Sequence, residues 1–274
     1  MLYLGSDICC FLLYHVVRYR RKVVRDNLVK SFPEKSAHEI KQIEKRFYHN
    51  FCDLIAEMLK LRRWKPDKVL ERVTVTNPEL IQELYANGKS VLIAMHHSSN
   101  WEWLWKILYT TSQHDHYAVY KKLESHYFDQ VVYKMRTSHI TDRESMIEDR
   151  KMKQAMDDMK DSLNAVFVLC DQSPRGADTD YWTDFLHRDT CWYTGLEILA
   201  KRYDYAVVYA EMIRPARGKY TVTFKLITDH PQATGEGTIL EQYVRQVERF
   251  IQNNPDNWLW SHRRWKHTRQ NKAS

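Results

Sequence analysis

The chain has 274 residues, of which 43% are hydrophobic, and this is enough to build one large α/β domain with a full core. It contains only seven Gly and seven Pro, so long linkers and disordered tracts are not expected. The formal net charge of +7 indicates acidic partners, a class that includes nucleic acid, anionic lipid headgroups and acidic proteins.

The aromatic and cysteine contents indicate the surroundings in which the protein works. Nine Trp and seventeen Tyr are many for this length, which is typical of proteins that work at a membrane interface. The five Cys have no C-x-x-C spacing and no His-rich neighbourhood. We therefore predict reduced thiols on a cytosol-facing protein, with no metal site and no cofactor.

The N-terminal region combines an apolar run with a basic cluster. Residues 8–17 are apolar except for Tyr14 and His15, but Asp7 interrupts the run, which is shorter than the roughly 20 residues that span a bilayer. No Lys or Arg precedes the run, so a signal peptide is not expected. Because five cations follow at residues 18–25, we predict that residues 1–24 consist of an apolar helix, which is inserted in a membrane or lies on its surface, and a basic juxtamembrane cluster. The alternative is a buried first helix with a solvated basic end.

The next segments lead to the most informative stretch of the chain. Ser36 and Glu39 have the spacing of a capping box, which predicts the start of a long amphipathic helix that continues to Leu61. Residues 69–75 and 79–85 are then predicted to form a short strand and a helix.

Residues 90–105 have the pattern of a strand that passes directly into a helix. The short apolar run 91–95 predicts a buried strand, and Asn100 is a good N-cap for the helix that follows. His97 lies at the end of this strand, where sites collect in open α/β sheets. Glu102 follows five residues later, so its carboxylate could fold back onto the imidazole and fix its tautomer. His96 is the competing candidate.

The rest of the chain alternates between strands and helices. Strands are predicted at 117–120, 165–170, 206–214 and, as an edge strand, 220–227; helices are predicted at 127–136, 146–159, 196–202 and 239–251. Lys121 and Arg214 stand at strand ends, where cations can meet a phosphate, although a solvated surface is nearly as good an interpretation for Lys121. Asp171 and Gln172 begin a second polar loop at a strand end.

Two motifs resemble a known family. The stretch His97-Ser98-Ser99-Asn100-Trp101-Glu102 resembles the H-x4-D/E motif of the lysophospholipid acyltransferase superfamily. It is most similar to the H-[aromatic]-G-N-W-E form of the late acyltransferases of lipid A biosynthesis, the lauroyl and myristoyl transferases, although Ser98 and Ser99 depart from that form. The tail at 255–266, PDNWLWSHRRWK, is similar to the P-E-x-W-L-W-x-H-R-R-W ending of the same family. The resemblance extends over about residues 18–266.

The resemblance implies a fold and an activity. The expected fold is α/β, a single glycerolipid acyltransferase-like domain at 25–274 with a central mixed sheet flanked by helices. The expected enzyme moves an acyl chain from an acyl carrier protein thioester to a hydroxyl of a lipid A precursor, at the cytoplasmic face of the bacterial inner membrane. His97 would be the general base, oriented by Glu102, and no cofactor or nucleic acid would take part.

The resemblance and the strand-end positions together give a set of candidate substrate-binding residues: Asn100, Lys121, Arg136, Asp171, Gln172, Arg214, Arg263 and Arg264. Within this set, Arg136 matches an arginine that contacts acceptor phosphate in the family, and Lys134 could fill the same role. Arg264 has an alternative interpretation, in which it stacks on an indole and pins the tail to the domain.

Two other functions remain open at this level. The superfamily motif does not name the acceptor, so the chain could acylate another glycolipid or a glycerolipid. A basic, non-enzymatic module that binds a membrane surface or nucleic acid would also carry this charge, and it would not need His97.

Overall fold

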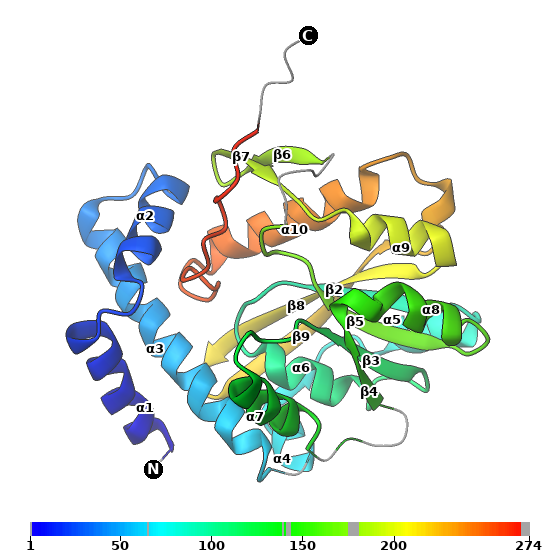
Figure 1. Ribbon diagram of the computed structural model, residues 1–274, viewed down its shortest axis with the longest axis horizontal. Helices are drawn as coiled ribbons and strands as arrows, with labels where there is room; N and C mark the ends of the chain where they lie inside the picture. Colours follow the sequence, from blue (N-terminus) through cyan, green and yellow to red (C-terminus); the bar gives the residue numbers. More distant parts are fainter. Residues whose placement is uncertain (1, 65, 139, 141–143, 175–180, 270–274) are drawn as a thin grey trace.

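A seven-stranded sheet lies at the centre of the molecule. The computed structural model describes residues 2–64, 66–138, 140, 144–174 and 181–269 (Figure 1). The sheet has the order β1-β9-β8-β2-β5-β3-β4. Its strands are β1 (Val73–Val75), β2 (Val91–Met95), β3 (Asp115–Tyr120), β4 (Glu144–Glu148), β5 (Asn164–Leu169), β8 (Ala206–Ala216) and β9 (Lys219–Thr228). The five strands from β8 to β4 are parallel, whereas β9 is antiparallel to β8 and parallel to β1, so the sheet is mixed as predicted.

Helices cover both faces of this sheet. The α-helices and the π-helical η1 are α1 (Leu2–Phe11), η1 (Leu12–Val16), α2 (Arg21–Ser31), α3 (Ala37–Leu61), α4 (Pro66–Leu70), α5 (Glu79–Ala86), α6 (Trp101–Leu108), α7 (His126–Arg136), α8 (Met152–Asp158), α9 (Gly195–Tyr203) and α10 (Thr238–Asn253). Of these, α1 and α2 lie to one side of the sheet and pack mainly against α3 (Figure 1). A small hairpin of β6 (Trp182–Phe185) and β7 (Arg188–Cys191) lies beside α10 (Figure 1).

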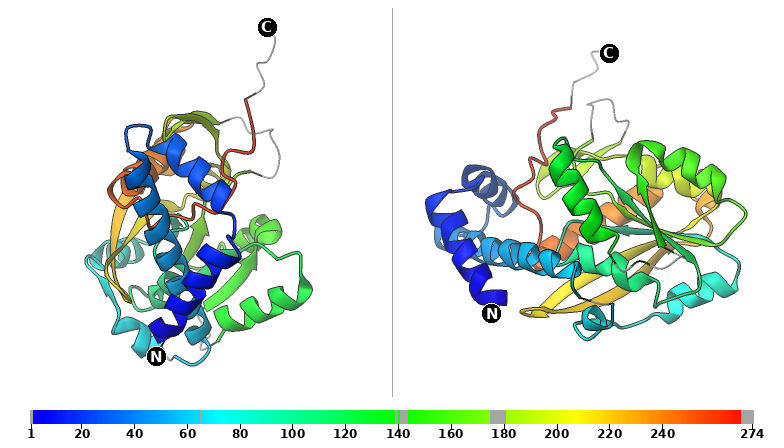
Figure 2. Two further views of the ribbon diagram at one scale, coloured as in Figure 1. Left: turned by 90° about the vertical axis from the view of Figure 1, so that its left-hand side faces the viewer. Right: turned by 60° about the horizontal axis from the view of Figure 1, so that its bottom comes forward.

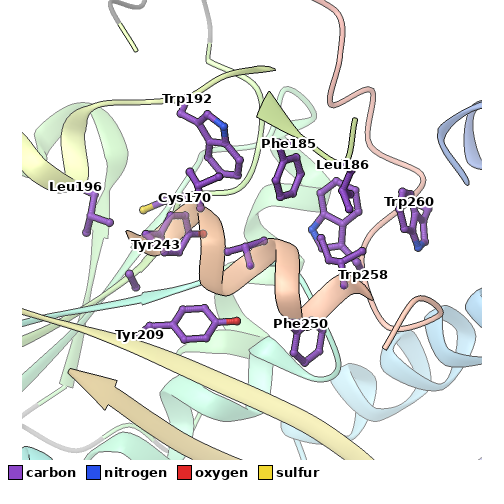
Figure 3. Close-up of a cluster of buried hydrophobic side chains, with 14 of the residues drawn as sticks. Cys170, Phe185, Leu186, Trp192, Leu196, Tyr209, Tyr243, Phe250, Trp258 and Trp260 are labelled. Atoms are coloured by element: carbon purple, nitrogen blue, oxygen red, sulfur yellow. The ribbon is translucent and has the colours of Figure 1, made fainter. Parts of the chain in front are cut away.

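Strand β2 divides the core into two layers. Its side chains alternate between the faces, so Leu92 and Ala94 join the cluster under α9 and α10, while Ile93 and Met95 join the cluster under α5 and α6. All five residues of β2 are buried, as expected for a parallel strand that is covered on both faces. Figure 3 shows part of the first layer, where aromatic side chains of α10 meet those of β6, of Trp192 just after β7 and of the C-terminal tail.

Most of the predicted elements are confirmed, and three differ. The strand predicted at 69–75 is limited to β1, because residues 69 and 70 are the end of helix α4. Residues 146–148, predicted as the start of a helix, belong to β4, because they pair with residues 118–120 of β3 in parallel register. The predicted helix is therefore shortened to α8, which begins at Met152. Strand β9 is not at the edge of the sheet, because the three-residue strand β1 pairs with its outer side. The capping box is confirmed, since Ser36 accepts from the backbone of Glu39 and the Glu39 side chain accepts from Ser36.

The N-terminal helix α1 lies along α3 (Figures 1 and 2). Its inner side is polar: Tyr3 donates to Glu57 at 2.8 Å, and Ser6 donates to Asp53 at 2.6 Å. Its outer side is apolar and open, as shown by Leu4, Ile8 and Phe11, which are 67%, 58% and 59% exposed. Among the described residues, no helix is both long enough and apolar enough to cross a membrane. The membrane association of residues 1–24 stays a prediction.

Candidate functional site

His97 and Asp171 lie opposite each other at the carboxyl ends of neighbouring strands. Parallel strands β2 and β5 pair Met95 with Leu169, and each strand is followed two residues later by one of the two polar side chains. The Nδ1 atom of His97 is 2.6 Å from Oδ1 of Asp171, and the backbone N–H of His97 donates to Oδ2 at 3.0 Å. The register of the sheet therefore sets the position of the imidazole relative to the carboxylate.

The Asp171 carboxylate is buried and has several donors around it. Besides its two contacts with His97, it accepts a hydrogen bond of 2.7 Å from the indole Nε1 of Trp258. Burial alone would raise the pKa of Asp171, but the nearby imidazole of His97 and these hydrogen bonds outweigh burial and hold the pKa well below its usual range. An ionised Asp171 accepts a hydrogen bond from the Nδ1–H of His97. The other ring nitrogen, Nε2, then carries the lone pair that can accept a proton.

The Nε2 side of the His97 ring faces the next loop residue, Gln172. The side-chain amide nitrogen of Gln172 lies 3.2 Å from Nε2, and the ring edge of Trp101 lies against the imidazole with centroids 5.2 Å apart. The His97 side chain is 15% exposed, whereas Asp171 is 2% exposed. The imidazole is therefore partly accessible to solvent, whereas the carboxylate that orients it is not.

The C-terminal tail holds both loops of this site in place. The backbone N–H of Leu259 donates to the carbonyl of His97 at 3.0 Å, and the backbone N–H of Ser99 donates to the carbonyl of Asn257 at 3.1 Å. On the other loop, the N–H of Ser173 donates to Nε2 of His262 at 3.2 Å. The sequence interpretation did not include Trp258 or His262 in the site, although both belong to the tail motif.

Glu102 does not fold back onto His97 as predicted. It accepts two hydrogen bonds from the guanidinium of Arg136, from Nε at 2.8 Å and from Nη2 at 2.5 Å, and a third from Nε1 of Trp101 at 3.1 Å. Within the described residues, no hydrogen bond joins Glu102 to His97. The first turn of α6 directs the carboxylate toward α7, and the nearest strand-end carboxylate, Asp171, takes the place beside the imidazole.

Asn100 caps α6 as predicted, and both its oxygen and its nitrogen form hydrogen bonds within the protein. Its Oδ1 accepts from the N–H of Trp103 at 3.1 Å, and its amide donates to Oε2 of Glu57 at 2.6 Å. Glu57 also accepts from Tyr220 at 2.7 Å and from Tyr3 of α1. Burial raises the pKa of Glu57, although these donors oppose that effect. The start of α6 is thus linked through one buried carboxyl group to the N-terminal helix.

The two tail arginines lie in different surroundings. Arg264 is buried: it donates to the carbonyl of Cys191 at 2.7 Å and its guanidinium lies over the Trp192 ring at 4.3 Å. Burial lowers its pKa to about 10. This is the arrangement of the alternative interpretation, in which Arg264 pins the tail to the domain. Arg263 is exposed, and its backbone carbonyl accepts from Ser173 at 3.1 Å.

The other predicted cations lie apart from the imidazole. Arg214 forms an ion pair of 2.5 Å with Asp53 and also bonds Asn50. It lines a hollow beside the site, together with Phe47, Asn50, Phe51, Leu54, Ser99, Trp101, Tyr220, Asp256, Asn257, Trp258 and Leu259. Lys121 is exposed immediately after β3.

His96, the competing candidate, lies inside the core. Its ring stacks with Tyr209 and meets Phe250 edge-on, with centroid distances of 5.7 and 4.4 Å. Burial lowers the pKa of His96 to about 4, so the ring is neutral at pH 7. It has no access to a substrate, and His97 is the better placed base.

No three His, Cys, Asp or Glu side chains among the described residues are grouped so that they could hold a metal ion. The site thus consists of a histidine, a buried carboxylate that orients it and a neighbouring amide, which is an arrangement suited to moving a proton from a hydroxyl group.

Comparison with known proteins gives one family. The sequence model of the family described as bacterial lipid A biosynthesis acyltransferase matches residues 4–267, which is nearly the whole chain. A search of curated proteins returns no match.

Proposed function

The chain belongs to the bacterial lipid A biosynthesis acyltransferase family, and from this premise we propose that it moves a fatty acyl chain from an acyl carrier protein thioester to a hydroxyl group of a lipid A precursor. The enzyme class, an acyltransferase of lipid A biosynthesis, follows from the family itself. The observation that supports the mechanism is the hydrogen-bonded pair of His97 and Asp171 at the carboxyl edge of the sheet, in which the imidazole is partly exposed and the carboxylate is buried.

In the proposed reaction, Nε2 of His97 takes the proton of the acceptor hydroxyl as its oxygen attacks the thioester carbonyl. Asp171, held ionised by its donors, stabilises the imidazolium that forms. The carbon–sulfur bond then breaks, and the imidazolium returns the proton to the departing thiolate. The products are an ester and a free carrier thiol, so no covalent acyl-enzyme and no cofactor are needed.

The negative charge on the attacked carbonyl oxygen needs a donor. We assign this role to the side-chain amide of Gln172, which lies next to Nε2 and would turn from the imidazole to the oxyanion when substrate enters. The Asn100 side chain is committed to Glu57 and to the cap of α6. The sequence interpretation also considered backbone N–H groups up to Gly176, but residues 175 and 176 lie outside the described residues.

The donor and acceptor would be held by different cations. Lys121 and Lys122 are exposed and make a suitable docking point for an acidic carrier protein. Arg263 is the exposed guanidinium on the tail beside the Asp171 loop, so we propose it for acceptor phosphate; Arg136 and Arg264 are already engaged in the protein.

We place the enzyme at the cytoplasmic face of the bacterial inner membrane, where its acceptor would be. The support is the apolar outer side of α1 and η1, which continues through Val16 and Val17, both more than half exposed, into exposed Arg18 and Lys22. Apolar side chains beside cations suit the boundary between acyl chains and anionic headgroups.

The test is a transfer assay with purified protein, an acylated carrier protein and a phosphorylated lipid A precursor, with products identified by mass spectrometry. We expect one added acyl chain, and we expect His97→Ala to lower the rate by about 10²-fold or more. Glycerolipids and other glycolipids are tested as acceptors in parallel assays. Transfer to one of those acceptors alone would replace the proposed substrate, and a His97→Ala enzyme that keeps more than about a tenth of the rate would exclude this base.

A further inference from the structure

Helix α7 has little contact with the rest of the protein. Of its eleven residues, all of which are described, only Met135 is buried. An isolated helix shorter than about 12 residues is marginal in water, and most helices owe their stability to a face packed on the core. In Figure 2, right, α7 stands at the front of the molecule with no other described element drawn over it. Its outer surface is therefore open to a partner.

The open surface of α7 is largely aromatic. Tyr127 and Phe128 are 72% and 62% exposed, and Val131 follows one turn later on the same flank. Leu123, in the loop just before the helix, is exposed as well. A polar flank runs beside this one and consists of His126, Gln130 and Lys134, spaced four residues apart. The outer surface of helix α7 is thus divided into an apolar flank and a polar flank.

The same helix reaches the site from its inner side. Arg136, in its last turn, donates two hydrogen bonds to Glu102 at the start of α6. Glu102 follows His97 by five residues. The side chain of Ser138, just beyond the helix, donates to the carbonyl of Leu61 at the end of α3 at 3.1 Å. These contacts anchor the C-terminal end of α7 beside the site while its aromatic N-terminal half stays open.

We propose that the aromatic flank of α7, made of Leu123, Tyr127, Phe128 and Val131, is a second membrane-contacting surface, which inserts into the headgroup boundary of a phospholipid bilayer. This inference rests on the proposed function, in which the acceptor is a membrane lipid. Tyr and Phe are favoured at that boundary, where an apolar ring meets acyl chains and a polar tip meets water. Contact through α7 brings the start of α6, and with it His97, toward the lipid.

The charges near this flank favour a lipid over an acidic protein as the partner. Within α7 itself, Asp129 offsets Lys134 and Arg136 is paired with Glu102, so the helix has little net charge, in contrast to Lys121 and Lys122 in the loop before it. A surface for an acidic partner would depend on unopposed cations and would be strongly sensitive to salt. Binding through Tyr127 and Phe128 depends instead on apolar burial and is expected to change little with salt.

The test measures binding of the full chain to vesicles of phosphatidylethanolamine and phosphatidylglycerol at about 3:1 by flotation. The variant is Tyr127→Ser/Phe128→Ser, which removes two exposed rings and should leave the melting temperature unchanged. The matched control is Ile198→Ser on α9, where the side chain is 57% exposed. Membrane binding through α1 could mask the effect of the α7 variant. The α7 variant and the Ile198→Ser control are therefore measured also in a chain that carries Ile8→Lys/Phe11→Lys.

We expect the α7 double variant to weaken vesicle partitioning by at least about tenfold in the α1-substituted background, at low and at high salt, while Ile198→Ser does not. Unchanged partitioning in both backgrounds would overturn the proposal. So would unchanged partitioning together with a raised, salt-dependent KM for acyl carrier protein, because the partner would then be the acidic protein. The flotation result needs no activity, so a chain that binds through α7 but transfers no acyl group would refute the proposed function and leave this inference standing.

Discussion

Trp258 and Asp171 are 87 residues apart in the chain, yet the indole N–H of Trp258 donates to the carboxylate at 2.7 Å. This donor helps to keep a buried carboxylate ionised behind the imidazole of His97. Trp258 and Trp260 of the tail differ in this respect, because the indole of Trp260 donates to a backbone carbonyl, that of Pro255, at 2.6 Å.

We predict that Trp258→Phe lowers kcat by about tenfold, since it removes a hydrogen bond to a charged group while it keeps a ring in the core. Trp260→Phe is the matched control: it also replaces a buried tryptophan and removes one hydrogen bond. Both variants should lose similar amounts of thermal stability, measured by circular dichroism. If kcat falls equally in both, the Trp258 contact is only structural.

The second prediction separates the two carboxylates of the site. Asp171→Asn keeps a similar shape but cannot stabilise an imidazolium, so kcat should fall by roughly 10²- to 10⁴-fold with little change in KM. Glu102→Gln should affect mainly the melting temperature, because Glu102 contacts Arg136 rather than His97. The opposite pattern, with activity lost in Glu102→Gln and kept in Asp171→Asn, would restore Glu102 as the orienting group.

Glu102 and Arg136 should behave as a coupled pair in a double-mutant cycle. Glu102→Met alone leaves a guanidinium without its charge partner, and we expect a loss of roughly 2 kcal/mol in the free energy of unfolding, reduced from the usual cost because the Arg136 side chain is 22% exposed. The double variant Glu102→Met/Arg136→Met should lose less than the sum of the two single variants in urea denaturation. Additive losses would show that the pair contributes nothing as a pair, and would leave Arg136 available for acceptor phosphate.

Local features of the sequence predicted local structure correctly. The apolar run before His97, the cap at Asn100 and the capping box at Ser36 depend on residues a few positions apart, and each is confirmed. The class of fold follows from the alternation of such segments. By contrast, the three residues of β1 carry too little pattern to show that they would cover the outer side of β9.

The carboxylate that orients His97 could not be predicted from local features of the sequence. The spacing of five residues made Glu102 a reasonable candidate, but Asp171 is 74 residues away and becomes its neighbour only because β2 pairs with β5. Strand order is set by packing of the whole chain, which local spacing does not specify. The contact with Trp258 has the same origin, since the tail returns to the strand ends. A polar residue at the end of each buried strand was the available signal, and it identified Asp171 without its role.

The N-terminal helix should respond differently on its two sides. Ile8→Lys places a charge on the outer side and should reduce the membrane-bound fraction in cell fractionation, while the melting temperature stays unchanged. Ser6→Ala removes the donor to buried Asp53 and should cost about 1 kcal/mol of stability without changing the membrane-bound fraction. If Ile8→Lys instead lowers the melting temperature and leaves fractionation unchanged, the outer side is a protein contact and not a membrane contact.

The last prediction concerns the stability of the fold at acidic pH. His96 is buried among Tyr209 and Phe250, with Asp171 and His97 as the titratable groups that act on it electrostatically, and burial lowers its pKa to about 4. In the unfolded chain the same ring has a pKa of about 6.5. Between these values the unfolded state binds a proton that the folded state does not, so the free energy of unfolding falls as the pH drops from about 6.5 to about 4. The contribution of His96 is of the order of 2–3 kcal/mol over this window.

His96→Phe keeps an aromatic ring against Phe250 and cannot titrate, so urea denaturation at pH 7 and pH 5 should show a smaller loss of stability than in the unsubstituted chain. His262, whose pKa is also lowered to about 4 by burial, should supply much of the loss that remains. An equal loss in both proteins would mean that His96 becomes protonated without cost, and hence that water reaches it in the folded state.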